Sequence, residues 1–220
     1  MKSYFNMKDY SEWQDILELD DPLGSGPSRK TRLKHPNKKM LYGLFDIIDY
    51  VIDKLGQDTE MVEVGCYSGE STRIFAKKFK HVYAVEPWDL VKQAYHEIPN
   101  KTIEEAFRKH IAPCDNITVI KNKSLLAAED FDKKVGFVYI DANHSFNAVL
   151  ADIAAWKEKV LPGGILGGHD YGHPTRILGC TKAIDQYFGK PDKTFKDYSW
   201  LVHCKKNIPP ITNTPYLLLV

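Results

Sequence analysis

The feature that most constrains the fold is a regular alternation, from residue 61 to residue 168, of short apolar runs with segments of helical periodicity. Apolar runs of this length are typical of strands buried on both faces. Strands separated by helices favour a parallel sheet with helices on both sides. We therefore predict an α/β fold. The five runs are MVEV (61–64), HVYAVE (81–86), ITVI (117–120), VGFVYI (135–140) and ILGG (165–168).

Helical patterns fill the intervals, and a different pattern follows the fifth run. Apolar residues at three- and four-residue spacing predict helices over 40–55, 70–79, 101–111, 124–130, 146–161 and 175–188. Two further strands are predicted near 194–198 and 200–204, close enough along the chain to pair antiparallel. The expected sheet has seven strands and is mostly parallel, with the last strand antiparallel.

The two ends of the chain differ in composition from its centre. Residues 21–39 combine Pro, Gly and Ser with basic side chains, so residues 1–39 are predicted to form an N-terminal arm or lid. The basic cluster in this arm either recognises an anionic group or is a solvated segment. Residues 40–206 are the predicted folded domain. Residues 207–220 are a predicted extended tail that docks on the body or on a second copy of the chain, in a homo-oligomer.

Charge and composition argue against several classes of partner. The 220 residues carry 30 Lys and Arg against 29 Asp and Glu, whereas binding nucleic acid through bulk charge needs a basic excess. No stretch approaches the ~18 consecutive apolar residues of a membrane span, and no secretory signal is visible. The four cysteines lie far apart, as in a reduced protein. We expect a cytoplasmic protein that binds neither nucleic acid nor membrane.

A glycine-bearing turn follows the first strand, in the sequence EVGCYSGEST (63–72). Gly65 and Gly69 permit a tight turn and a close approach of backbone to ligand. Position 67 is Tyr and no G-K-[ST] is present, so neither a dinucleotide fingerprint nor a P-loop is supported. Glu86 ends the second strand about 20 residues after Gly65, the separation at which an acid binds a ribose diol. What remains is a nucleoside ligand without a pyrophosphate.

Two acids, Asp141 and Asp170, follow the fourth and fifth strands, whose carboxyl ends share one edge of the sheet. A lone acid at a strand end is commonly solvated or caps the next helix. Two acids on neighbouring strands can instead bind a hard divalent cation, which activates a bound hydroxyl. His169 precedes Asp170. Because imidazole suits magnesium poorly, His169 is either a third ligand or a contact to substrate, or the metal is absent.

His144 lies three residues after Asp141, immediately before the predicted helix 146–161. An imidazole with an unperturbed pKa of ~6.5 suits general-base catalysis near neutral pH. The alternative is a residue that only begins the helix, where polar side chains bond free backbone amides. Both can hold, with His144 as the base and Ser145 or Asn143 as the cap.

The ordered set of these motifs resembles a known family. E-x-G-x-x-x-G after the first strand, an acid ending the second, YIDANHS ending the fourth and Pro-Gly-Gly before the fifth are similar to class I S-adenosylmethionine-dependent methyltransferases. The resemblance covers about residues 40–205. The segments IDANHSFNAVLADIAAWKEKVLPGG and ILGGHDY resemble the branch of small-molecule O-methyltransferases that includes macrolide-sugar and cephalosporin-pathway enzymes. Catechol and caffeoyl-CoA O-methyltransferases are more distantly similar.

The resemblance implies a Rossmann-like methyltransferase domain over residues 40–206, with S-adenosylmethionine as cofactor and magnesium as the expected metal. The acceptor is a hydroxyl of a small molecule, with a sugar or a glycosylated metabolite favoured. The implied catalytic residues are His144 and Asp141, and the implied metal ligands are Asp141, Asp170 and His169. The implied cofactor contacts are Glu63, Gly65, Cys66, Tyr67, Ser68, Gly69, Glu86, Trp88, Asn122, Lys123, Ser124 and Asp141.

Several assignments stay open on the sequence alone. Trp88 either packs on the adenine or is a core or surface aromatic. Cys66 fits better as a small, weakly polar side chain than as a catalytic thiol. The family often has an acid near positions 122–124, and this chain has none there. The acceptor pocket is expected near Tyr171, His173 and Arg176.

Two other functions compete with the O-methyltransferase hypothesis. The first is methylation of a nitrogen or a nucleic acid; the chain lacks the Asn-Pro-Pro-Tyr and Asp-Pro-Pro-Tyr tetrapeptides of amine-methylating enzymes. The second is a catalytically silent protein that still binds the cofactor.

Overall fold

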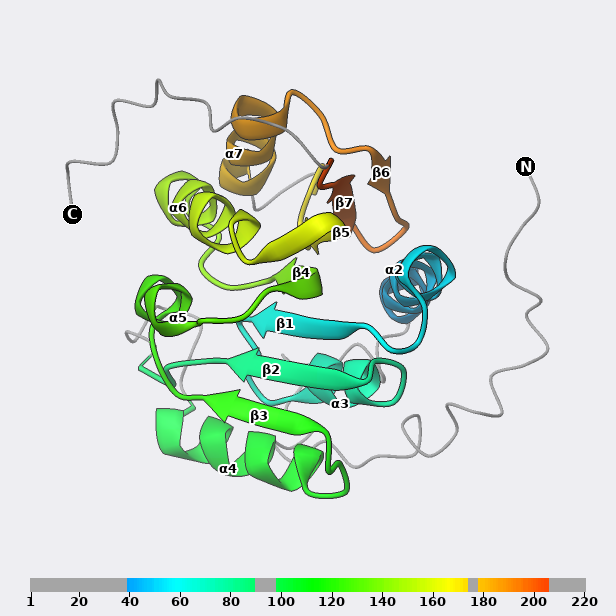
Figure 1. Ribbon diagram of the computed structural model, residues 1–220. Coiled ribbons are helices and arrows are strands. Elements are labelled where there is room, and N and C mark those ends of the chain that lie inside the picture. The colour runs from blue at the N-terminus through cyan, green and yellow to red at the C-terminus, as the bar shows by residue number, and fades with distance from the viewer. Residues whose placement is uncertain (1–38, 90–97, 174–177, 206–220) are drawn as a thin grey trace.

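The computed structural model describes residues 39–89, 98–173 and 178–205 (Figure 1). The predicted tail, Arg176 and all of the predicted arm except Lys39 lie outside these residues. The division into 1–39, 40–206 and 207–220 therefore stays a prediction. Among the described residues, no helix is both long enough and apolar enough to cross a bilayer.

The described strands form one seven-stranded sheet in the order β3-β2-β1-β4-β5-β7-β6. Strands β1 to β5 are parallel, and β7 pairs antiparallel with both β5 and β6. The predicted α/β class, the Rossmann-like sheet and its antiparallel last strand are confirmed. The strands are β1 Glu60–Val64, β2 His81–Val85, β3 Ile117–Ile120, β4 Val135–Ile140, β5 Val160–Gly168, β6 Lys193–Thr194 and β7 Trp200–His203.

The described helices lie on both faces of this sheet (Figure 1). Helices α5, α6 and α7 pack on the face that holds Val138 and Leu166, and α2 and α3 on the face that holds Phe137 and Ile165. Helix α4 packs on the second face at the β2 end, through Phe107. The helices are α2 Lys39–Leu55, α3 Glu70–Ala76, α4 Asn100–Ile111, α5 Ser124–Asp130, α6 Phe146–Lys157 and α7 Leu178–Phe188.

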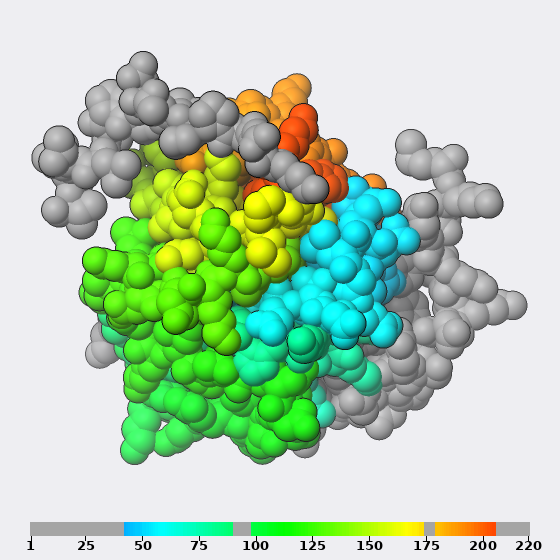
Figure 2. Space-filling view, viewed as in Figure 1, coloured from blue at the N-terminus to red at the C-terminus, as the bar shows by residue number. Residues whose placement is uncertain are grey.

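The apolar face of α2 seals one side of the sheet. Figure 2 shows α2, in cyan, lying against β5 in yellow and β7 in orange-red, although these segments are far apart in the sequence. Leu44 and Ile48 of α2 are fully buried in the same cluster as Ile165 and Leu201. Burying these side chains stabilises the fold by about 2 kcal/mol each, and it brings α2 close to the turn that precedes β7.

Several boundaries differ from the sequence prediction, and backbone hydrogen bonds account for the changes at α3 and β5. Helix α3 ends at Ala76 rather than 79, because the amides of Lys78 and Phe79 both donate to the Phe75 carbonyl, at 3.0 and 2.9 Å, and close the helix. Helix α6 ends at Lys157 rather than 161. Strand β5 begins at Val160 rather than 165, because Val160 already pairs with Val135 ahead of a register shift.

The largest difference lies between α7 and β7. The strand predicted near 194–198 is only the two residues of β6. Residues 195–199 instead form a turn, in which the Phe195 amide donates to the Ser199 carbonyl and the Tyr198 amide to the Phe195 carbonyl. The turn brings a buried aspartate, Asp197, into the interior.

Candidate active site

The glycine turn after β1 has the left-handed backbone that the sequence requires of it. Gly65 has a φ of +90° and Gly69 a φ of +82°, and Tyr67 between them has a φ of +46°. A Cβ atom at Gly65 would lie 2.2 Å from the Asp141 carbonyl oxygen. Only glycine therefore lets the turn lie directly against the segment that follows β4.

Glu86, at the end of β2, holds this turn in place. Its Oε2 accepts a hydrogen bond from the Tyr67 amide at 2.9 Å, and its Oε1 accepts one from the Trp88 amide at 3.3 Å. Burial raises the pKa of the Glu86 carboxyl, and the backbone donors oppose that rise. A carboxylate offers about four acceptor positions, so Glu86 can still accept hydrogen bonds from a ribose diol.

Helix α4 holds the opposite side of the turn. The His110 Nδ1 lies 2.6 Å from the Ser68 carbonyl oxygen, so this nitrogen carries the proton and donates it. The Arg73 guanidinium donates to the His110 carbonyl at 3.1 Å. Phe107 packs so closely on Gly69 that a Cβ there would meet its ring at 2.8 Å. No sequence pattern predicts this role of His110, because a histidine inside an amphipathic helix carries no distinguishing motif.

Trp88 lies beneath the turn, in the core rather than on an open ligand surface. Its indole Nε1 donates to the Tyr67 carbonyl at 2.9 Å, and its ring packs on Phe107 with centroids 4.9 Å apart. The side chain is buried. Trp88 therefore fixes the turn from below, in agreement with the core alternative.

Two polar side chains of the motif face the interior. Glu63 is fully buried and accepts hydrogen bonds from the hydroxyls of Ser71 and Thr72 at the start of α3. Burial raises the pKa of Glu63 to about 7. The Cys66 thiol donates to backbone carbonyls, and burial raises its pKa well above the usual value, which makes it unreactive.

The segment after β3 is held mainly by structural contacts. The Asn122 side chain accepts from the Lys123 amide at 2.9 Å, and the Lys123 ammonium lies 3.5 Å from Asp89. The Ser124 hydroxyl donates to Asp152 at 2.5 Å and accepts from the Trp156 indole at 2.9 Å. These bonds use the Ser124 hydroxyl to tie α5 to α6, so it is not free for a cofactor.

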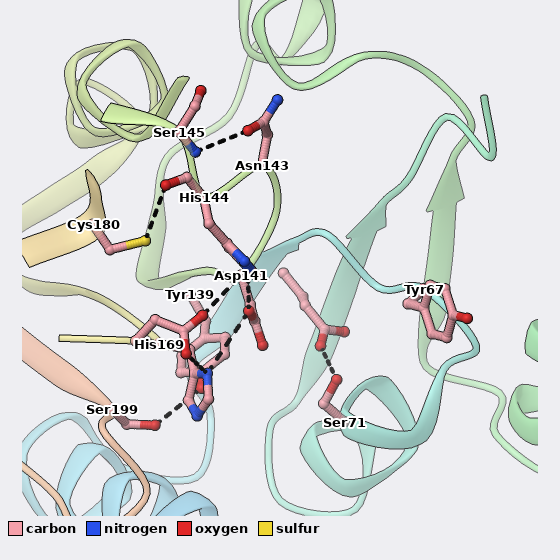
Figure 3. A network of polar contacts seen from close by, with 12 residues as sticks. Tyr67, Ser71, Tyr139, Asp141, Asn143, His144, Ser145, His169, Cys180 and Ser199 are labelled. Atoms are coloured by element: carbon pink, nitrogen blue, oxygen red, sulfur yellow. Dashed lines mark hydrogen bonds and ion pairs between the residues drawn. The ribbon is translucent and has the colours of Figure 1, made fainter. Parts of the chain in front are cut away.

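The ends of β4 and β5 bring two acids and two histidines together, of which Figure 3 labels Asp141, His144 and His169. The His144 Nε2 lies 3.4 Å from Asp141 Oδ1 and 3.3 Å from Asp170 Oδ2. The His169 Nδ1 lies 3.0 Å from Asp170 Oδ1 and 3.9 Å from Asp141 Oδ1. Asp170 has a φ of +70°, an uncommon conformation for a non-glycine residue. We refer to these four residues as the acid–histidine cluster.

The cluster combines accessible and covered groups. His144 is the accessible member, with 44% of its side chain exposed, whereas the side chains of His169 and Asp170 are only 8% and 6% exposed. Burial by itself lowers the pKa of His144, but the hydrogen bond to Asp141 and the charges of Asp141 and Asp170 outweigh it and raise that pKa. The Ser145 hydroxyl accepts from the Ala148 amide, so Ser145 is the cap of α6, as predicted. The His144 side chain therefore serves the cluster rather than the helix.

Asp141, His144 and Asp170 each offer one ligand atom, and these atoms lie within 4.8 Å of one another. This set differs from the one expected from the sequence, which had His169 in place of His144. Two carboxylates and an imidazole are suitable donors for a divalent metal, and the imidazole suits manganese or zinc better than magnesium.

Two of the residues expected around an acceptor lie beside the cluster. The Tyr171 hydroxyl donates to Asp185 at 2.8 Å, and burial together with this acid raises its pKa to about 12. The His173 ring packs on Tyr198, with centroids 4.7 Å apart. Tyr171 is therefore a structural phenol that ties the β5 end to α7, whereas His173 and Tyr198 form an aromatic pair.

The fold and the site together define a class of protein. A mostly parallel sheet in this strand order, with a glycine turn after β1 and an acid after β2, is the arrangement of the S-adenosylmethionine-dependent methyltransferases that the sequence resembles. The sequence matches the family described as a methyltransferase domain over residues 62–171, half of the chain. The chain therefore belongs to the methyltransferase-domain family and is an S-adenosylmethionine-dependent methyltransferase.

Solved structures show the same fold at low sequence identity. A proposed O-methyltransferase from Klebsiella pneumoniae matches with a TM-score of 0.58 and 13% identity, over 88% of this chain and 89% of that one. The N-methyltransferase NodS from Bradyrhizobium japonicum, in complex with S-adenosyl-L-homocysteine, matches with a TM-score of 0.51 and 14% identity, over 88% and 95%. An rRNA methylase from Streptococcus thermophilus matches at 0.52 and 15%, over 74% and 96%. No curated protein sequence matches the chain.

Proposed function

We propose that the protein transfers a methyl group from S-adenosylmethionine to a hydroxyl of a small molecule, with a sugar or a glycosylated metabolite as the favoured acceptor. The observation that supports this most directly is the position of His144. It is an accessible imidazole between two carboxylates, and the segment that carries it packs against the glycine turn through Gly65.

The glycine turn is the proposed cofactor site. S-adenosylmethionine supplies a methyl group on a sulfonium, which passes to an acceptor oxygen as the carbon–sulfur bond breaks and S-adenosylhomocysteine leaves. Glu86 accepts hydrogen bonds from the ribose diol, and residues 65–69 lie along the ribose and methionine parts. By fixing the turn, Trp88 and His110 hold donor and acceptor in line, which is the larger part of catalysis in such a displacement.

His144 is the proposed general base. In its neutral form it takes the proton of the acceptor hydroxyl as the oxygen attacks, and the two neighbouring carboxylates stabilise the imidazolium that forms. Asp141 and Asp170 are the proposed ligands of a divalent metal, and His144 stays outside this set because an imidazole nitrogen that coordinates a metal cannot take the proton. Such a metal would lower the pKa of a bound hydroxyl.

The first experiment tests His144. Purified protein is incubated with labelled S-adenosylmethionine and a panel of hydroxylated sugars and phenols, and binding of S-adenosylhomocysteine is measured by calorimetry. His144→Ala should lower turnover roughly 100-fold or more with the S-adenosylhomocysteine Kd unchanged. The matched control is His81→Ala, a histidine at the start of β2 that bonds Thr118 and should keep full activity. Full turnover by His144→Ala would remove this residue from the mechanism.

The second experiment tests the metal. Activity is measured after chelation and again after adding back magnesium, manganese or zinc. Loss on chelation and recovery with one of these ions supports Asp141 and Asp170 as ligands, and Asp170→Asn should then lose the recovery. A rate untouched by chelation would refute the metal proposal and leave the His144 proposal standing.

A further inference from the structure

A fully buried aspartate, Asp197, lies behind the acid–histidine cluster, in the turn between β6 and β7. Strand β7 is antiparallel to β5, and its first residue, Trp200, pairs with Gly168, the last residue of β5. The turn that precedes β7 therefore reaches the same edge of the sheet as Asp170. No sequence motif marks Asp197, because this placement depends on the antiparallel pairing.

Glycine on α2 makes room for this carboxylate. A Cβ atom at Gly43 would lie 2.2 Å from Asp197 Oδ1, so any other residue there would collide with it. Helix α2 thus covers the carboxylate and excludes water from it. A buried carboxylate is costly unless hydrogen bonds and an opposite charge compensate for the lost water.

The hydrogen bonds come from Ser199, and the ring of His169 lies beside them. The Ser199 amide donates to Asp197 Oδ1 at 3.1 Å, and the Ser199 hydroxyl donates to Oδ2 at 2.8 Å. Since the Ser199 proton points at Asp197, the Tyr139 hydroxyl, 3.0 Å away, must donate to the Ser199 oxygen (Figure 3). The His169 Nε2 lies 4.0 Å from Asp197 Oδ2.

The His169 ring is therefore placed between two acids. Its Nε2 faces Asp197, and its Nδ1 lies 3.0 Å from Asp170 Oδ1. A ring with a carboxylate on each side has a defined orientation. Outer groups orient metal ligands and catalytic acids in the same way. In this arrangement His169 supports Asp170 from behind rather than facing the accessible side of the cluster.

We propose that Asp197 is a positioning residue, which orients His169 and through it holds the Asp170 carboxylate in its working position. The inference deepens the proposed function and rests on it, because the working position of Asp170 has meaning only if the cluster is the active site. The contacts that carry the inference are the burial of Asp197 under Gly43, its hydrogen bonds with Ser199 and the placement of His169 between the two acids.

A double-mutant cycle tests whether Asp197 acts through His169. Asp197→Asn keeps the size of the side chain and removes its charge, and we expect kcat to fall about 10- to 100-fold, with the KM for S-adenosylmethionine within about twofold of the wild type. His169→Asn keeps a donor near Asp170 and removes the nitrogen that faces Asp197. The double variant should have the same kcat as the less active of the two single variants. Losses of kcat that multiply would overturn the proposal.

A second readout needs no turnover. The side-chain nitrogens of the histidines are followed by NMR, with the His169 signals assigned by their loss in His169→Asn. Asp197→Asn should shift the His169 signals and leave those of His203 in place. The matched control is Asp192→Asn, because Asp192 pairs with His203, at 2.8 Å, at the other end of β7. This variant should shift only the His203 signals and keep full activity.

The outcomes separate the two proposals. If no acceptor is methylated but the His169 signals still respond to Asp197→Asn, the proposed function fails and the contact between Asp197 and His169 stands. Unchanged His169 signals in Asp197→Asn overturn the inference whatever the activity. If Asp197→Asn does not fold, Ser199→Ala removes a donor to the same carboxylate; it should shift the His169 signals, and the absence of a shift overturns the inference.

Discussion

Glu86 has a structural role in the turn, and the proposed function gives it a second role in ligand binding. Its carboxylate accepts hydrogen bonds from the backbone amides of Tyr67 and Trp88. It has acceptor positions left for two hydroxyls. The same group therefore shapes the turn and presents the charge that a ribose diol would bond. An uncharged replacement should weaken ligand binding through both effects.

Glu86→Gln is expected to raise the Kd for S-adenosylhomocysteine about 10- to 100-fold, since a hydrogen bond to a charged group is worth about 1.5–3 kcal/mol. Calorimetry on the purified variant measures this directly. Asp89→Asn is the matched control, because Asp89 follows the same strand but pairs with Lys123 on the surface. The Kd of this variant for S-adenosylhomocysteine should stay within about twofold of the wild type. An unchanged Kd in Glu86→Gln would exclude Glu86 from the ligand site.

At this scale the sequence predicted the residues that follow strand ends and missed those that approach from elsewhere. Asp141 and Asp170 meet because parallel strands end at one edge, which the strand pattern alone implies. Asp197 and His110 reach the site through an antiparallel turn and through a helix, and such contacts depend on packing. Ser124 had the expected place in the chain, but its hydroxyl is bonded to Asp152.

Among the elements, the glycine turn and the segment after β4 form one unit. The Gly65 amide donates to the Val85 carbonyl, and the Asp141 amide donates to the Val64 carbonyl. With the Gly65 Cα against Asp141, the ends of β1, β2 and β4 are held at fixed separation. A change at Gly65 should therefore disturb the proposed cofactor turn and the acid–histidine cluster together.

A pair of glycine substitutions isolates this contact. Gly65 and Gly163 have nearly the same φ, +90° and +87°, but a Cβ atom at Gly163 meets nothing within 4 Å. Gly163→Ala should cost only the left-handed backbone strain, about 1–2 kcal/mol of unfolding free energy. Gly65→Ala should cost at least about 2 kcal/mol more, because its methyl group collides with backbone.

Urea unfolding of both variants measures these costs in stability. Calorimetry measures the Kd of each variant for S-adenosylhomocysteine. Gly163→Ala should bind S-adenosylhomocysteine as the wild type does. Gly163 precedes residues 165–168, the part of β5 that pairs continuously with β4, and lies away from the turn. Equal unfolding free energies for the two variants would show that the close approach of Gly65 to Asp141 does not matter for stability.

Element types were predictable because each has a strong local pattern, and the boundaries were less so. The strands 117–120 and 135–140 and the helix 124–130 begin and end where the sequence indicates. Strand β5 extends back to Val160 through Pro162, against the usual expectation for Pro-Gly-Gly, because its partner strand β4 offers Val135 for pairing. The turn at 195–199 replaced a predicted strand because Asp197 and Ser199 satisfy each other's hydrogen bonds locally.

For the whole molecule, the buried acids give folding a definite pH dependence. Burial raises the pKa of Glu63 to about 7 and of Asp152 to about 6, and it raises those of Glu86 and Asp46. An acid whose pKa is higher in the folded chain holds its proton more tightly there, so folding is favoured at low pH and loses this advantage as pH rises through the folded pKa.

The groups with opposite shifts act outside this range. Asp192 and Glu104 have pKa values below their usual 3.8 and 4.5, so their contributions are present at neutral pH and are lost only as pH falls through those lower values. The raised pKa of His144 changes the stability in the same direction as the buried acids do, because its extra proton is also lost as pH rises. Between about pH 5 and pH 7.5 the shifts therefore act in one direction, and the unfolding free energy should fall.

Glu63 should carry the largest single part of that fall. At about 1.4 kcal/mol for each pH unit over which the folded chain holds the extra proton, its pKa of about 7 corresponds to a fall on the order of 2 kcal/mol between pH 5.5 and pH 7.5. Urea unfolding near pH 5.5 and near pH 7.5 measures the difference. Glu63→Gln, which cannot titrate, should reduce it clearly, and Asp152→Asn should reduce it less because that acid has already lost most of its proton above about pH 6. Glu60→Gln, on the same strand but with a partly exposed carboxylate, should keep the wild-type difference. A wild-type protein that is equally stable at both pH values would show that Glu63 is not protonated in the folded chain.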